Sequence, residues 1–97
     1  MKKISFIIPC RNEANYIEET ITSVIKQKII NTDIEIIIVD GLSDDGTREI
    51  LFDIQKKDSR IIVIDNVKKI TPVALNLGVK KATGDYIFIL GAHAKIT

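Results

Sequence analysis

Several features that mark large protein classes are scarce or missing in this sequence. Its single cysteine, Cys10, excludes an internal disulfide and fits a reduced, cytoplasmic setting. No apolar run is long enough for a membrane span or for the core of a signal peptide, because the first one, residues 4–8, ends at Pro9. We therefore expect a cytoplasmic chain that contains no membrane span.

An excess of charge of one sign is also lacking. The 14 Lys and Arg residues nearly balance the 13 Asp and Glu residues, which leaves a formal net charge of +1. This balance gives no broad field to attract nucleic acid or an anionic membrane, so any phosphate site must be local. With few Gly (5) and Pro (2), 45% hydrophobic and 28% charged residues, the chain of 97 residues is typical of one folded α/β domain or part of one.

Short apolar runs alternate with segments of helical spacing. The runs are rich in Ile and Val and lack polar alternation, which predicts buried parallel strands at residues 4–8, 34–39, 61–64 and 86–90. Apolar residues recur at helical spacing at Ala14, Ile17, Ile21 and Val24, at Thr47, Ile50, Leu51 and Ile54, and at Leu75, Val79 and Ala82. The order βαβαβαβ predicts a Rossmann-like open parallel sheet with helices on both faces.

The boundaries of these elements carry turn and cap signals. Asp45 is expected to cap the second helix, Thr71 with Pro72 to begin the third, and Gly84-Asp85 to turn the chain into the last strand. The sequence stops seven residues after the fourth apolar run. We therefore expect a fragment with a sheet edge that lacks a partner strand and through which two copies could associate.

The loops after the strands are the places to look for a ligand site, because open parallel sheets bind ligands beyond the carboxyl ends of their strands. The first loop, residues 9–15, lacks the glycine-rich turn of a dinucleotide-binding dehydrogenase. Asp40 ends the second strand and Glu13 lies in the first loop, and either carboxylate could accept a hydrogen bond from a base imide or a ribose hydroxyl. Two such acceptors facing one cleft predict a nucleoside site.

Four segments in order resemble the successive landmarks of family 2 glycosyltransferases. They are residues 5–13 (SFIIPCRNE), 35–47 (EIIIVDGLSDDGT), 74–78 (ALNLG) and 82–90 (ATGDYIFIL), which together cover essentially the whole chain. The resemblance implies that residues 1–97 are the nucleotide-sugar-binding, N-terminal half of a GT-A fold, truncated before its second half. It also implies a UDP-sugar or other nucleotide sugar as donor, a divalent metal, and sugar transfer to a hydroxyl acceptor in polysaccharide or glycan synthesis, with the parent enzyme at the inner face of the membrane.

The same resemblance assigns individual residues. It matches Pro9, Arg11 and Glu13 to the loop that holds the nucleoside, Asp40 to the base-binding aspartate, and Asn76 and Gly78 to the helix segment beside the diphosphate. The fourth strand departs from the family, because the usual Asp-x-Asp motif is replaced by Gly91-Ala92-His93. Exopolysaccharide transferases of the succinoglycan type carry Asp-Ala-His-Ala here, which this chain resembles except for the first aspartate.

Metal binding and catalysis are both affected by this departure. His93 is the candidate ligand for Mn²⁺ or Mg²⁺, with weaker affinity than a carboxylate because hard ions prefer oxygen. The family's catalytic base belongs to the second half of the fold, so no catalytic residue is assigned here. We expect the chain alone to be inactive.

Simpler interpretations stand beside these assignments. Asp40 could merely end a strand, Glu13 could favour the dipole of the first helix, and Arg11 could be solvated. Asn76 could be a structural hydrogen-bonding residue, and His93 could be inert. The pairs Lys68-Lys69 and Lys80-Lys81 most simply solvate the surface, although Lys69 could approach a diphosphate.

Two further functional classes remain open at this stage. The chain could be a non-catalytic module that acts through self-association or contact with another protein. It could also be a receiver-like phosphoacceptor domain, in which Asp65 would fit the end of the third strand. Arg11-Asn12-Glu13 is a poor match for the acidic pair that a receiver needs, so this class ranks last.

Overall fold

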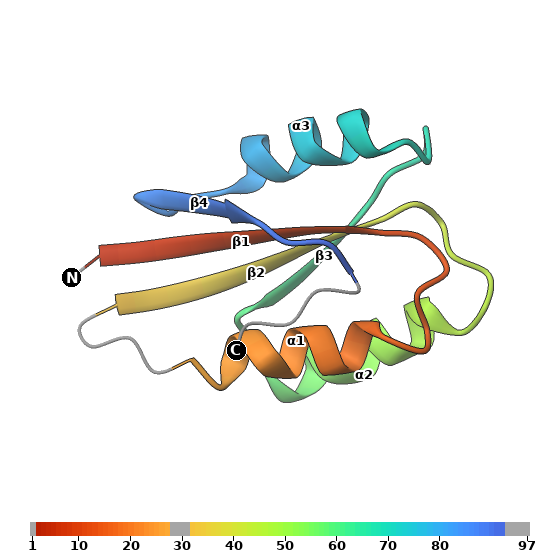
Figure 1. Cartoon of the computed structure of the whole chain (residues 1–97), viewed down its shortest axis with the longest axis horizontal. Helices are drawn as coiled ribbons and strands as arrows, with labels where there is room; N and C mark the ends of the chain where they lie inside the picture. The colour runs from red at the N-terminus through yellow and green to blue at the C-terminus, as the bar shows by residue number, and fades with distance from the viewer. Residues whose placement is uncertain (1, 28–31, 93–97) are drawn as a thin grey trace.

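The computed structural model describes residues 2–27 and 32–92 of the chain. Its strands are β1 (Lys2–Cys10), β2 (Thr32–Asp40), β3 (Ile61–Asp65) and β4 (Tyr86–Ile89), and its helices are α1 (Ile17–Ile25), α2 (Thr47–Lys57) and α3 (Thr71–Lys81). Figure 1 shows one sheet with α3 on one face and α1 and α2 on the other. The predicted βαβαβαβ order and open parallel sheet are confirmed.

The order of the strands places a switch point beside β1. The sheet runs β3-β2-β1-β4, and all neighbouring strands are parallel. From β1 the chain moves outward through β2 to β3, and then crosses the opposite face through α3 to place β4 on the other side of β1. The loops after β1 and β2 lead to α1 and α2 on one face, whereas the segment after β3 leads to α3 on the other face, and this divergence opens a crevice at this end of the sheet.

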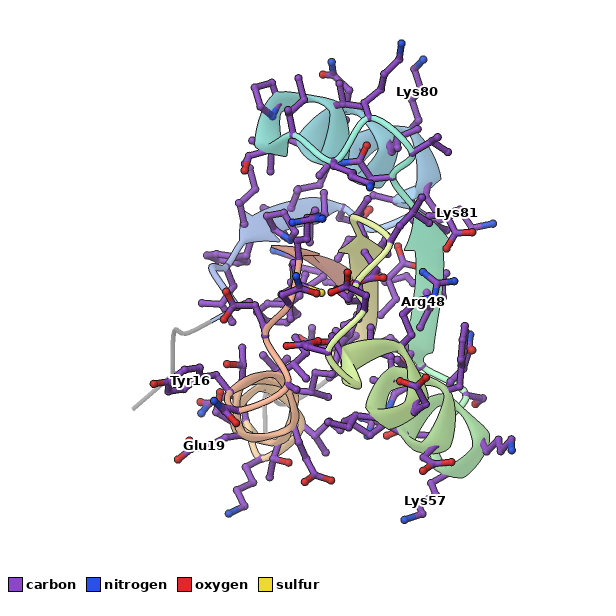
Figure 2. The ribbon with its side chains drawn as sticks, turned by 90° about the vertical axis from the view of Figure 1, so that its right-hand side faces the viewer. Tyr16, Glu19, Arg48, Lys57, Lys80 and Lys81 are labelled. Atoms are coloured by element: carbon purple, nitrogen blue, oxygen red, sulfur yellow. The ribbon has the colours of Figure 1, made fainter. Side chains whose placement is uncertain are left out.

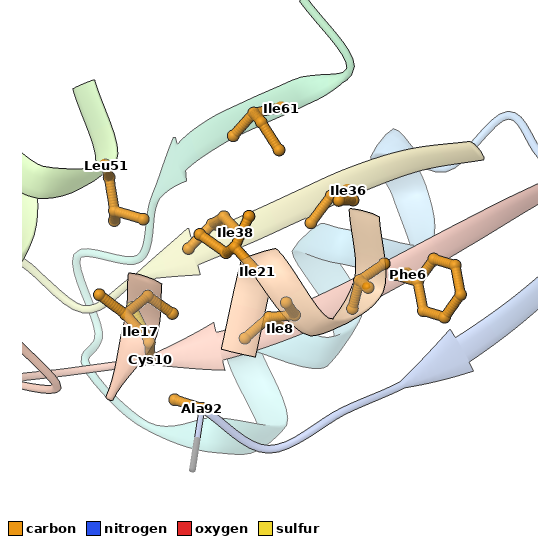
Figure 3. Close-up of a cluster of buried hydrophobic side chains, with 11 residues drawn as sticks. Phe6, Ile8, Cys10, Ile17, Ile21, Ile36, Ile38, Leu51, Ile61 and Ala92 are labelled. Atoms are coloured by element: carbon orange, nitrogen blue, oxygen red, sulfur yellow. The ribbon is translucent and has the colours of Figure 1, made fainter. Parts of the chain in front are cut away.

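The two central strands are buried on both faces, which explains their continuous runs of isoleucine. Alternate side chains along β1 and β2 point to opposite faces of the sheet. One set packs beneath α1 and α2, as Figure 3 shows for Ile8, Ile38 and Leu51. The other set, which includes Ile7 and Ile37, packs beneath α3. Helices on both faces thus explain why residues 6–8 of β1 and 36–39 of β2 are all apolar.

The fourth strand differs from the prediction of a buried strand. It ends at Ile89, and its residues are all exposed, the least being Ile87 at 43% and the most being Ile89 at 57%. The reason is its position, because β4 pairs with β1 along one side and none of its residues belongs to the described hydrophobic clusters. In the described part of the chain β4 is therefore an apolar edge strand, steadied by stacking of Phe88 on Phe6.

A polar network at the amino end of the sheet holds β4 in register. The buried Glu35 carboxylate accepts hydrogen bonds from the Ser5 hydroxyl (2.5 Å) and from the backbone N–H of Thr83 (2.7 Å). Burial alone would raise the pKa of Glu35, but these hydrogen bonds outweigh it and hold the pKa below its ordinary value. The predicted turn before β4 is present, because Asp85 N donates to the Lys3 carbonyl at 2.7 Å.

Two helix starts differ in detail from the cap signals. The residue that caps α2 is Gly46 at φ 100°, and the Asp45 carboxylate just before it accepts a hydrogen bond from Thr47 N at 3.1 Å. The residue that caps α3 is Ile70, so Thr71 is already helical and no side chain caps this helix. None of the described helices has the length and apolar character needed to cross a membrane.

Candidate functional site

A cavity of about 580 Å³ lies beyond the carboxyl ends of the strands, at the switch point of the sheet. Its walls come from the end of β1 and the loop after it, the loop after β2, the segment from β3 into α3, and the residues after β4. The lining residues are Pro9, Cys10, Arg11, Glu13, Gly41, Asn66, Lys69, Ile70, Thr71, Ala74, Gly91 and Ala92. Figure 2 looks onto this end of the molecule, with α3 on one side of the sheet and α1 and α2 on the other. The cavity therefore occupies the position that the sequence predicts for a ligand.

The loops after β1 and β2 are joined into one wall by hydrogen bonds between them. Three of the bonds involve backbone groups of the first loop and side chains of the second, and another ties Arg11 to the second loop. The bonds run from Arg11 Nε to Gly41 O (3.1 Å), from Asn12 N to Ser43 Oγ (2.8 Å), from Glu13 N to Thr47 Oγ1 (2.9 Å) and from Ala14 N to Asp45 Oδ2 (3.2 Å). The wall is thus held together by the protein's own groups, as a preorganised site requires.

Three of the predicted site residues meet in this cavity. Pro9, Arg11 and Glu13 all line it. The Arg11 side chain packs over Gly41, where an added Cβ would lie 3.2 Å from Arg11 Cδ. The structure thus brings together a flat apolar ring, a guanidinium and a carboxylate, and their contacts with a nucleoside stay a prediction.

Asp40 lies behind the wall, with a side chain that is 0% exposed and does not line the cavity. It accepts hydrogen bonds from Ser43 N (3.0 Å), Ser43 Oγ (2.5 Å) and Arg48 Nη1 (2.8 Å). Arg48, labelled in Figure 2, also pairs with Asp65 Oδ1 at 2.9 Å. Asp40 therefore shapes the loop after β2, and its direct contact with a base stays a prediction.

The charge of Asp40 is stabilised by these partners. Burial alone would raise the pKa of this carboxyl. Hydrogen bonds from the Ser43 hydroxyl, the Ser43 N–H and Arg48 outweigh burial and hold the pKa of Asp40 below its ordinary value. Asp40 is thus an anion at neutral pH, and its charge is stabilised by donors inside the protein.

The remaining predicted residues do not meet the others at the cavity. Asn76 is exposed on α3 and does not line the cavity. At Gly78 an added Cβ would lie 2.5 Å from Ile7 Cγ2, so this glycine lets α3 approach the sheet closely. Gly78 thus has a packing role, and the contacts of Asn76 and Gly78 with a diphosphate stay a prediction. His93 lies outside the described residues.

The segment after β3 contributes more to the site than the sequence indicated, since only Lys69 of this segment was considered near a ligand. Asn66 is 2% exposed and lines the cavity, its Nδ2 donates to Ile70 O at 2.9 Å, and its Oδ1 has no hydrogen-bond partner among the described residues. Lys69 and Thr71 line the cavity beside it. The only signal for Asn66 was its place in the loop after the third apolar run, since its burial depends on how the chain turns into α3.

Each loop after β1, β2 and β3 contains one residue in the left-handed region. These residues are Asn12 (φ 55°), Leu42 (φ 56°) and Lys69 (φ 64°). Residues other than glycine have a cost of roughly 1–2 kcal/mol in this conformation, which is least for asparagine. Such strain concentrates at ligand sites, where the surrounding contacts hold it in place.

The described residues do not supply a ligand set for a divalent metal. Among them no group of three or more His, Cys, Asp or Glu side chains is arranged to hold an ion. Glu13 is a carboxylate at the cavity, whereas Gly91 and Ala92 have no ligating side chain. Burial, and next the Asp40 charge, raise the pKa of the Cys10 thiol far above its ordinary value, so this thiol stays protonated.

Comparison with known proteins places the chain in a known group. The family described as glycosyl transferase family 2 matches residues 5–97. A dolichyl N-acetyl-α-D-glucosaminyl phosphate 3-β-D-2,3-diacetamido-2,3-dideoxy-β-D-glucuronosyltransferase of Methanococcus voltae is 38% identical over 96 residues, covering 97% of this chain and 30% of that protein. The succinoglycan biosynthesis protein ExoA of Rhizobium meliloti is 37% identical over 89 residues, covering 90% of this chain and 27% of that protein.

A solved structure extends the comparison to the fold. The mannosyltransferase PcManGT of Pyrobaculum calidifontis, in complex with GDP-Man and Mn²⁺, superposes with a TM-score of 0.87 at 26% identity. The match covers 97% of this chain and 28% of that one. The resemblance to family 2 and to succinoglycan-type transferases is confirmed, and the chain spans less than a third of the length of these relatives.

Proposed function

Because this chain belongs to glycosyl transferase family 2, we propose that it forms the donor-binding part of a glycosyltransferase and holds a nucleoside diphosphate sugar in the cavity beyond the strand ends. The observation that carries the proposal is the cavity itself, which lies at the switch point and has Pro9, Arg11 and Glu13 in its walls. The parent reaction is transfer of the sugar to a hydroxyl acceptor in polysaccharide or glycan synthesis.

Each cavity residue has a chemical role in this proposal. The Glu13 carboxylate accepts a hydrogen bond from a base imide or a ribose hydroxyl, and the Arg11 guanidinium neutralises part of the ligand's charge. Pro9 offers an apolar surface for the base. Asp40 acts through the loop after β2, since it holds Ser43 and with it the position of Asn12 opposite.

In the parent reaction the acceptor oxygen displaces the nucleoside diphosphate from the anomeric carbon, and negative charge develops on the departing diphosphate. This chain binds and orients the donor, while the group that takes the acceptor proton is not assigned to it. A divalent ion, where one is bound, would act as a Lewis acid on the diphosphate. Of the described residues, only the Glu13 carboxylate at the cavity is suited to such an ion.

A nucleotide titration of the ¹⁵N-labelled chain tests the proposal. We expect backbone amide shifts from UDP or GDP to concentrate in the loops after β1, β2 and β3. The variant Glu13→Ala should weaken binding roughly tenfold, because it removes a hydrogen bond to a charged group. Glu18→Ala is the matched control, since Glu18 is an exposed carboxylate in the first turn of α1 and does not line the cavity. Shifts outside the cavity loops, or equal affinity of the two variants, would contradict the assignment.

A second candidate role is self-association through β4, which is favoured by the exposed apolar side chains of that edge strand. Such contact is compatible with donor binding, because β4 lines the cavity only through Gly91 and Ala92 beyond its end.

A further inference from the structure

The charged groups that line the cavity are cationic in excess. Arg11 and Lys69 are the cations and Glu13 is the anion. Outside the lining, Arg48 pairs with both Asp40 and Asp65 and so neutralises one of these two carboxylates. The lining side chains themselves carry one cation in excess, which favours an anion at the walls that hold Arg11 and Lys69, in a chain whose net charge is only +1.

The turn between β3 and α3 brings Lys69 and the amino end of α3 to the same wall of the cavity. The N–H of Lys69 donates to Asn66 O at 3.1 Å, and this turn holds Lys69 in the left-handed region at φ 64°. The helix α3 begins two residues later at Thr71 and has no side-chain cap, while Pro72 contributes no N–H. The first-turn N–H groups and the positive end of the helix dipole are thus available at the wall formed by Lys69, Ile70 and Thr71.

Asn66 supplies an independent sign of a missing ligand at this wall. Its side chain is buried, it lines the cavity, and its Nδ2 is held by the Ile70 carbonyl, so the amide orientation is fixed. Its Oδ1 has no hydrogen-bond partner among the described residues. A buried acceptor without a partner is costly, and a ligand hydroxyl would satisfy it.

We propose that Lys69 and the amino end of α3 bind the diphosphate of the donor directly, with a ribose hydroxyl donating to Asn66 Oδ1, so that diphosphate binding by this chain does not require a divalent ion. The inference rests on the proposed function, and it adds a segment that the family resemblance did not assign. It also accounts for Gly91, which stands where the family pattern has the first carboxylate of its Asp-x-Asp motif and which has no ligating side chain.

The experiment compares a nucleoside with its diphosphate in the presence and absence of metal. Uridine and UDP are titrated into the labelled chain in EDTA, and again with Mn²⁺, with guanosine and GDP as a second pair in case the base differs. We expect the diphosphate to bind at least roughly tenfold more tightly than the nucleoside in EDTA, as charge-assisted contacts provide. Added Mn²⁺ should change the affinity for the diphosphate less than threefold.

Matched lysine variants locate the effect. Lys69→Met should remove most of the preference for the diphosphate and leave the affinity for the nucleoside unchanged. Lys68→Met is the control, because Lys68 is an exposed neighbour that does not line the cavity. Asn66→Ala should weaken nucleoside and diphosphate binding by the same factor, with the amide spectrum showing that the chain remains folded.

The outcomes separate this inference from the proposed function. Nucleoside binding in the cavity loops with no preference for the diphosphate in EDTA would overturn the inference alone. So would equal effects of Lys69→Met and Lys68→Met, or a gain of tenfold or more in UDP or GDP affinity on adding Mn²⁺. Failure of both nucleosides and both diphosphates to bind would overturn the proposed function as well.

Discussion

Replacing Asp40 with asparagine separates a structural role for this carboxylate from a direct role in ligand binding. The substitution keeps the shape of the side chain but exchanges one acceptor oxygen for an NH₂ group. In the wild type, Ser43 and Arg48 donate hydrogen bonds of 2.5–3.0 Å to the carboxylate. The new NH₂ group would face one of these two donors. The same substitution at Asp65 is the control, because both carboxylates pair with one Arg48 but Asp65 is 53% exposed.

The expected magnitude follows from burial. Each hydrogen bond to a buried charge is worth about 1.5–3 kcal/mol, and Asp40→Asn loses at least one such bond. Arg48 keeps Asp65 and some contact with water, which offsets part of the loss. We therefore expect the free energy of unfolding to fall by about 2 kcal/mol for Asp40→Asn, or roughly 8–16 °C in Tm for a chain of this size. Asp65→Asn should lower the free energy of unfolding by less than about 1 kcal/mol, because the ion pair of Asp65 with Arg48 is exposed to solvent.

The pH dependence sharpens this prediction. The pKa of Asp40 is lower in the folded chain than its ordinary value. Its stabilising contribution is therefore complete above the unfolded-state pKa of about 3.9 and is lost as the pH falls through the folded pKa. In urea unfolding followed by circular dichroism, the gap between wild type and Asp40→Asn should be largest at neutral pH and narrow below about pH 4. Equal unfolding midpoints for the two asparagine variants, or a gap that does not change with pH, would refute this account of Asp40.

Two further predictions concern packing and association. Gly78→Ala should lower the free energy of unfolding by about 1–2 kcal/mol, because overpacking against the stiff Ile7 side chain exceeds the helix gain of about 0.5–1 kcal/mol from alanine. Gly91→Ala is the control and should be neutral, because a Cβ added at Gly91 has no atom within 4 Å. A Gly78→Ala variant as stable as wild type would contradict the packing role of this glycine. Sedimentation equilibrium should show association of the chain that rises with concentration. Ile89→Glu on β4 should abolish this association, whereas Val67→Glu, at an exposed residue outside β4, should not. A strict monomer over a wide concentration range would exclude contact through β4.

The sequence predicts the central part of the fold well because its signals there are local. Continuous runs of Ile and Val in β1 and β2 require cover on both faces, and the structure provides it. The run at residues 86–90 has the same pattern, yet β4 is exposed. Its cover depends on which strands lie beside it, and strand order is a property of the whole chain that no local pattern contains.

The sequence predicts where the site lies, but it predicts only some of the residues that form it. Glu13 follows from the rule that ligands bind beyond strand ends and Arg11 from the family resemblance, and both line the cavity. Asp40 satisfies the same rule, but donors three and eight residues further along the chain hold its side chain inside the protein. The burial of Asn66 and the left-handed conformation of Lys69 could not be predicted, because both are produced by the turn into α3.

The hydrogen bonds that join the loops after β1 and β2 also bear on how quickly a ligand can enter and leave. The protein's own hydrogen bonds hold that wall, so we expect encounter on this side to need no slow rearrangement, with the conformational entropy of the loops lost on folding rather than on binding. The lifetime of a complex would then depend chiefly on the contacts that break when the ligand departs. Variants of this wall and variants of the β3–α3 segment can therefore be compared through their dissociation rates as well as their affinities.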